Sequence, residues 1–213
     1  RLFKTSFGSN ERPLLALIPV DGPPAAIVPE LELLSFEAIG FEGEVFSWRD
    51  QTGYADAFKA LAAHMPVRTL AVEGQVMRVF VQHALTAALP GLDVRDAEAA
   101  ISGLRICKSD DEIAALARAI AISETALAET LAQVRVGMAE TEVQRILTSA
   151  LFAHGADDHA FGPIVAAADN SAMPHAHARP DYKIKAGDAL LLDFGARKDG
   201  LCADITRTVF VGD

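Results

Sequence analysis

The sequence predicts two domains, an α/β unit over residues 1–105 and an α+β unit over residues 106–213. In the first part, short apolar runs alternate with helical patterns, which is typical of an α/β architecture. In the second part, two helical patterns precede a group of apolar, β-branched runs, and this order is typical of an α+β architecture. A chain of 213 residues has room for two domains of modest size.

The first domain is expected to begin with a β-hairpin. Two apolar runs, at residues 14–18 and 25–28, flank the turn-forming sequence Asp-Gly-Pro-Pro at 21–24. Further along, helical and β-branched patterns predict two helices with a buried strand between them, at 55–64, 69–72 and 76–89. The first domain carries no chemical motif that we recognise.

The second domain is expected to begin with a long helix. Ser109 and Glu112 form a capping-box pattern that marks a helix start, and apolar residues then recur at helical spacing as far as Leu127. A second helix is predicted at about 141–154, with Gly155 just beyond its end. The remaining apolar runs predict three strands, at 164–168, 189–194 and 202–211.

Two aspartates lie within the last predicted strands, Asp193 in LLLDFGA and Asp204 in CADITRTVFV. If these runs form a hairpin with Lys198-Asp199 at its tip, antiparallel pairing places Asp193 directly opposite Asp204 on one face. Opposed carboxylates with Cβ atoms about 4.5–5.5 Å apart repel each other, so a buried pair needs a cation. Their oxygen atoms suit a divalent metal, although a hairpin with two aspartates is also compatible with solvated turn chemistry.

Five motifs resemble the pita-bread metallopeptidases, a family that includes Xaa-Pro aminopeptidase, Xaa-Pro dipeptidase (prolidase) and methionine aminopeptidase. The motifs are Asp193-Phe194-Gly195, the D-x-T-R-T run from Asp204 to Thr208, Met173-Pro174-His175, the turn Lys185–Asp188, and the junction Leu104–Ile113. The resemblance covers nearly the whole chain and is most specific over residues 161–212. It implies a creatinase-like N-terminal domain followed by the first half of a pita-bread domain.

The resemblance also implies the roles of individual residues. Asp193 and Asp204 would be metal ligands, and one histidine and two glutamates of the family site would lie beyond residue 213. His175 would act as a proton shuttle or as a hydrogen-bond donor to the tetrahedral intermediate, in contact with substrate. Phe161 would line the substrate pocket, although it is equally plausible as a core residue. His177, two positions after His175, is expected to be a solvated loop residue.

The family likeness implies metal-dependent cleavage of the bond between an N-terminal residue and proline, as in aminopeptidase P or prolidase. Two divalent ions are expected, manganese first, with cobalt or zinc as alternatives. The partners would be peptides with proline at the second position and a second copy in a homodimer. Two other functions stay open: a creatinase-like, metal-free amidinohydrolase, against which the two aspartates argue, and a silent module that binds peptides or proteins. The 213 residues alone are expected to be inactive.

Bulk composition excludes several function classes. The net charge of −10 disfavours nucleic acids and anionic membranes as partners. Apolar runs are shorter than the roughly 18–20 residues that span a bilayer. The two cysteines, Cys107 and Cys202, lack the spacing of a metal site, so we expect buried, reduced thiols in a cytoplasmic protein.

Overall fold

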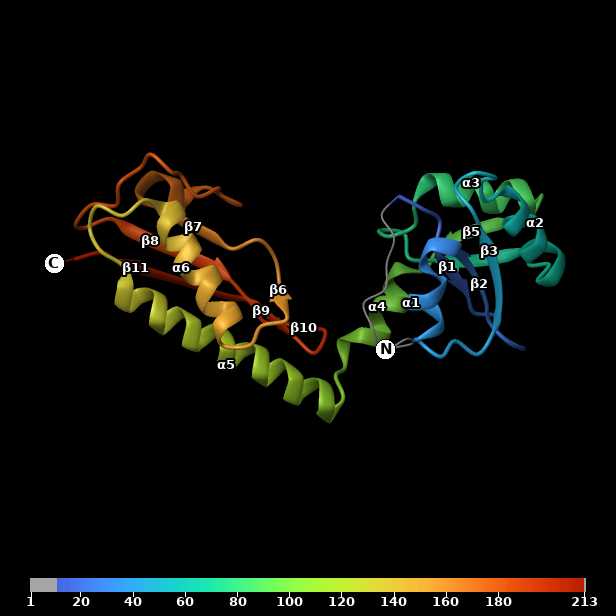
Figure 1. The fold of residues 1–213 in the computed structure, drawn as a ribbon, viewed down its shortest axis with the longest axis horizontal. Coiled ribbons are helices and arrows are strands. Elements are labelled where there is room, and N and C mark those ends of the chain that lie inside the picture. Colours follow the sequence, from blue (N-terminus) through green and yellow to red (C-terminus); the bar gives the residue numbers. More distant parts are fainter. Residues whose placement is uncertain (1–10, 213) are drawn as a thin grey trace. The chain divides into compact units, whose positions relative to one another are not determined.

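The computed structural model describes residues 11–212, and the chain divides into two compact units after Cys107 (Figure 1). The first ten residues of the predicted domain 1–105, and residue 213, lie outside the described residues. An α/β unit is followed by an α+β unit, in the order that the sequence predicted. Each unit is described by itself below.

The N-terminal unit contains two small sheets. In the first, β2 (Ala25–Pro29) pairs antiparallel with β1 (Leu15–Leu17), as predicted, and parallel with β3 (Glu44–Trp48). In the second, β4 (Thr69–Val72) pairs parallel with β5 (Asp93–Asp96). In the described part of this unit, the short 3-10 helix η1 (Glu30–Glu32) and four α-helices accompany the sheets: α1 (Leu33–Glu37), α2 (Ala55–His64), α3 (Val79–Ala88) and α4 (Glu98–Ile106).

Strand β2 lies at the centre of this unit, because both of its faces are covered. Ala25 and Ile27 pack into the cluster that contains Phe58 of α2, while Ala26 and Val28 pack with Phe36 of α1. By contrast, only Val72 is buried in β4. A strand does lie at residues 69–72, as predicted, but the prediction that it is buried is wrong. The reason is that β4 belongs to a sheet of only two strands, which leaves most of its side chains uncovered.

The C-terminal unit begins with two helices, α5 (Asp110–Gln133) and α6 (Glu140–Ala153), which pack against each other. Two antiparallel three-stranded sheets follow, ordered β11-β8-β7 and β10-β9-β6. Their strands, together with the short 3-10 helix η2, are β6 (Asp158–His159), β7 (Ile164–Ala167), η2 (Ala168–Ala172), β8 (Ala189–Phe194), β9 (Ala196–Lys198), β10 (Leu201–Cys202) and β11 (Ile205–Phe210).

Helix α5 begins with the predicted capping box. The Ser109 amide donates to Glu112 Oε2 at 2.8 Å, and the Glu112 amide donates to Ser109 Oγ at 3.4 Å. The buried stripe of this helix consists of small residues, Ala115, Ala119, Ser123, Ala126 and Thr130. Small side chains allow close approach, and Ser123 Oγ accepts a hydrogen bond from the Ala196 amide of β9 at 2.9 Å.

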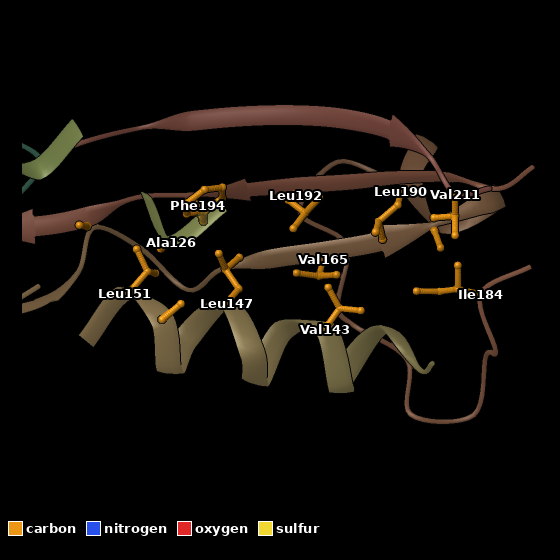
Figure 2. Close-up of a cluster of buried hydrophobic side chains, with 13 residues drawn as sticks. Ala126, Val143, Leu147, Leu151, Val165, Ile184, Leu190, Leu192, Phe194 and Val211 are labelled. Atoms are coloured by element: carbon orange, nitrogen blue, oxygen red, sulfur yellow. The ribbon is translucent and has the colours of Figure 1, made fainter. Parts of the chain in front are cut away.

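The core of the C-terminal unit lies between α6 and the sheet of β7 and β8 (Figure 2). Val143, Leu147 and Leu151 of α6 point toward Leu190 and Leu192 of β8. Each leucine buried in this way stabilises the fold by about 1.5–3 kcal/mol relative to exposure. Because side chains alternate along a strand, the remaining residues of β8 face away from the helices.

Both cysteines are exposed, so the expectation that they are buried is wrong. Cys107 follows α4 as its C-cap residue. Cys202 alternates with the buried Ala203, which sends its side chain to the outer face of the hairpin. Among residues 11–212, no helix has both the length and the apolarity needed to cross a bilayer.

Candidate metal centre on the β8–β11 hairpin

The hairpin that carries both aspartates has a tighter turn than the sequence analysis assumed. Lys198 pairs with Leu201, so the tip consists of Asp199 and Gly200, whose φ angles are 49° and 79°. Positive φ at both central residues defines a type I′ turn, for which Asp-Gly is a preferred sequence. The predicted tip, Lys198-Asp199, is therefore wrong by one residue.

The shifted tip changes the pairing of the aspartates. Asp193 lies opposite Thr206, and Phe194 lies opposite Ile205. Continued toward the turn, the same register places Asp204 opposite Gly195. The predicted direct opposition of Asp193 and Asp204 is wrong, because moving the turn by one residue moves each partner by two.

The aspartates nevertheless lie on the same face. Asp193 and Thr206 are directly opposed, and Asp204 precedes Thr206 by two residues, so all three side chains leave the sheet on one side. Asp204 and Thr206 are exposed, whereas Ile205 between them is buried. A diagonal pair has Cα atoms about 7–8 Å apart, which weakens the repulsion of directly opposed charges. Both carboxylates would supply oxygen ligands to a divalent ion bound at this face.

One oxygen of Asp193 is held by its cross-strand neighbour. Thr206 Oγ1 donates a hydrogen bond to Asp193 Oδ1 at 2.9 Å. Partners of this kind orient a carboxylate ligand and raise its affinity for a metal. Thr206 belongs to the D-x-T-R-T run but was not predicted to have a role; its position two residues after Asp204 was the available signal.

Gly195 sets the backbone path beside Asp204. A Cβ atom at this position would lie 1.7 Å from the Ala203 carbonyl oxygen and 2.6 Å from the Ala203 carbonyl carbon. Only glycine permits this approach without a backbone shift. The glycine of the Asp-Phe-Gly sequence therefore lets the chain before Asp204 pass close to the first strand.

The predicted histidines lie in the segment between β7 and β8. His175 and His177 are both exposed, and the residue between them, Ala176, is buried. His175 has a left-handed backbone with a φ of 56°. Phe161 is half-buried in the connection between β6 and β7. The catalytic role of His175 and the pocket role of Phe161 stay predictions.

The donor set on the hairpin suits a hard divalent ion, because it consists of carboxylate oxygens. Among residues 11–212, however, no three His, Cys, Asp or Glu residues gather in a group that could hold a metal ion. Asp193 and Asp204 can thus supply part of a coordination sphere.

Comparison with known families assigns both units. Residues 3–107 match the creatinase/prolidase N-terminal domain, and residues 114–213 match metallopeptidase family M24. An uncharacterized peptidase of Staphylococcus aureus is 25% identical over 205 residues, which are 96% of this chain and 56% of the relative. The chain thus spans about half the length of the curated relatives that it matches.

Solved structures of related proteins support the same assignment of the two units. A prolidase from Thermococcus sibiricus has a TM-score of 0.88 and 31% identity, with 97% of this chain and 56% of the prolidase covered. An X-Pro aminopeptidase from Thermotoga maritima has a TM-score of 0.73 and 28% identity, with coverage of 90% and 52%. The chain therefore combines a creatinase/prolidase N-terminal domain with part of a pita-bread domain of metallopeptidase family M24.

Proposed function

We propose that the complete protein is a metal-dependent peptidase that cleaves the bond between an N-terminal residue and proline. The observation that carries this proposal is the pair Asp193 and Asp204 on one exposed face, with Thr206 bonded to Asp193. The similarity to a prolidase and to an X-Pro aminopeptidase supports the choice of substrate. Peptides are the substrate class of the family.

Each residue has a defined task in this proposal. Asp193 and Asp204 would hold two divalent ions, and Thr206 would restrain the Asp193 carboxylate. The ions, when bound, supply a water of lowered pKa and polarise the scissile carbonyl. His175 would hold or donate a proton at the reacting carbonyl, and Phe161 would form part of the pocket wall. Proline at the second position carries no N–H and fixes φ, so a site shaped for it need not satisfy that donor.

The substrate test compares matched peptides with the full-length protein. A tripeptide with proline at position two should be hydrolysed faster than the same peptide with alanine there. A marked preference for the tripeptide over an Xaa-Pro dipeptide would indicate aminopeptidase P, whereas equal rates would indicate prolidase. Equal cleavage of the alanine and proline tripeptides would remove proline specificity from the proposal.

The metal test is separate. We propose manganese as the working ion, because an oxygen-rich site favours a hard cation; cobalt and zinc are the ions to compare. Elemental analysis of the active protein should find about two divalent ions per chain, and chelation should abolish activity. An active preparation free of metal would overturn the peptidase proposal and favour a creatinase-like reaction. Light scattering on the same sample tests the homodimer that we also propose.

A further inference from the structure

Glu140 is a fully buried acidic side chain at the start of α6. It is the first residue of that helix, its exposure is 0%, and it is the single charged residue in the buried set of residues 11–212. An ionised carboxylate is expensive to bury unless hydrogen bonds and a counter-charge replace its water. The hydrogen-bond partners of Glu140 therefore indicate which part of the chain this buried carboxylate holds in place.

Those partners lie at the beginning of a single segment, residues 168–178, or directly beside one of its ends. At the beginning, the Ala167 amide donates to Glu140 Oε1 at 2.8 Å, and Asn170 Nδ2 donates to Oε2 at 2.9 Å. At the end, the Arg179 amide donates to Oε2 at 2.7 Å, and Arg179 Nη2 donates to Oε1 at 2.9 Å. Asn170 Nδ2 also donates to the His177 carbonyl at 3.0 Å, so it joins the beginning of the segment to a residue near its end, two positions after His175.

The segment needs such restraint, because it contains two non-glycine residues in the left-handed region. Ala168 has a φ of 51°, and His175 has a φ of 56°. Strained backbone of this kind persists when the surrounding structure over-determines it, and it is frequent at functional sites. The segment also starts beside the hairpin that carries Asp193 and Asp204, since Ala167 pairs with Leu190 of β8 and η2 packs against β8.

A purely helical role for Glu140 does not explain its burial. A carboxylate in the first turn favours a helix through the helix dipole, yet it can do so from the surface. Glu142 already stabilises the N-terminus of α6 from the surface: its side chain is 41% exposed, and it accepts a hydrogen bond from the Ala139 amide at 2.5 Å. Glu140 instead accepts hydrogen bonds from residues in and beside the segment that carries His175.

We propose that Glu140 is a positioning residue, which holds segment 168–178 in one conformation and so presents His175 to the substrate. The inference rests on the proposed function for the role of His175, but not for the restraint of the segment. Asn170 and Arg179 act with Glu140, and the hydrogen bond to Glu140 raises the pKa of the Arg179 guanidinium. The guanidinium of Arg179 therefore stays a cation beside the Glu140 carboxylate.

The test uses three variants of the full-length protein. Glu140→Gln keeps the shape but places an amide against donors, Asn170→Ala removes the link to His177, and Glu142→Gln is the matched control two residues away. Hydrogen exchange of residues 168–178 should speed up about tenfold or more in the first two variants, because bonds to a charged acceptor are lost. In Glu142→Gln, exchange of this segment should stay at the wild-type rate.

Kinetics on an Xaa-Pro peptide supply the second measurement. In Glu140→Gln and Asn170→Ala, kcat and kcat/KM should fall together by about 10²-fold, with metal content unchanged. The reason is that a catalytic group is misplaced whereas binding of the substrate in its ground state is unchanged. Glu142→Gln should keep both constants. If Glu140→Gln does not fold, Asn170→Ala decides the test, since Asn170 is only half-buried.

Two results would overturn the positioning role: unchanged exchange of residues 168–178 in the folded variants, or faster exchange with unchanged kcat. Absence of Xaa-Pro hydrolysis in the wild-type protein is a different failure. It would refute the proposed function, while the exchange measurement would still report on the restraint of the segment by Glu140.

Discussion

Thr206 and Asp193 are joined across β11 and β8 by a hydrogen bond of 2.9 Å, from the threonine hydroxyl to carboxylate Oδ1. Thr206→Val keeps the β-branched shape but removes the donor. Metal affinity should fall about 10–100-fold, as for other partners that orient a ligand. Calorimetric titration of the metal-free, full-length protein with manganese measures it. Thr208→Val, opposite Leu191 on the same face, is the control and should bind normally.

Neutralising either aspartate should abolish activity with little loss of fold. Asp193→Asn and Asp204→Asn each remove a charge where cations are expected while keeping the side-chain shape. The double variant should be no slower than either single one, because residues that act as a unit are non-additive. Turnover on an Xaa-Pro peptide, with circular dichroism as the check on folding, gives the answer. Near-native turnover of Asp204→Asn would show that this residue is not a ligand.

The two histidines should differ sharply. His175→Ala should lower turnover about 10²–10⁴-fold, the usual range for a general acid or base, and should leave metal content intact. His177→Ala should be nearly silent, because its side chain is expected to be solvated. Steady-state kinetics on both variants decide the matter. The opposite ranking would assign the catalytic role to His177.

Gly195→Ala should disturb the hairpin although the change is a single methyl group. The new Cβ would lie 1.7 Å from the Ala203 carbonyl oxygen, and backbone yields less readily than a flexible side chain. We expect a destabilisation of about 1–3 kcal/mol or more, together with weaker metal binding, since residue 204 must move. Thermal unfolding of the variant measures the first effect. Gly162→Ala, which meets no atom within 4 Å, should unfold like the wild type.

Local signals in the sequence were enough for the long helices and strands of the C-terminal unit and for part of the N-terminal unit, where α1, β3 and α4 were not predicted. The capping box at Ser109, the helix at 55–64 and the strand at 189–194 were all predicted with bounds close to those observed. The strand Asp93–Asp96 was missed, because it holds one apolar residue and owes its existence to pairing with β4. Pairing between distant strands leaves no periodic pattern in a short polar run.

The geometry of the candidate site differs from the one expected from the sequence, and the roles of its residues stay predictions. Asp193 and Asp204 lie on one face, yet their register was wrong, although the Asp-Gly sequence at 199–200 carried the turn signal. No pattern in the sequence indicated that Glu140 is buried. Acidic residues are common in the first turn of exposed helices, and its partner Arg179 lies 39 positions away.

The two-residue turn at Asp199-Gly200 has a consequence for how this protein can change during evolution. Exposed turns usually accept insertions and deletions more readily than strands do. Here, adding or removing one residue at the tip would slip the returning strand by one position, and every side chain on it would exchange faces. Asp204 and Thr206 would then point at the helices, and Ile205 would point at solvent. The exposed tip of the hairpin should therefore resist a change of length, and the φ of 79° at Gly200 restricts substitution there as well.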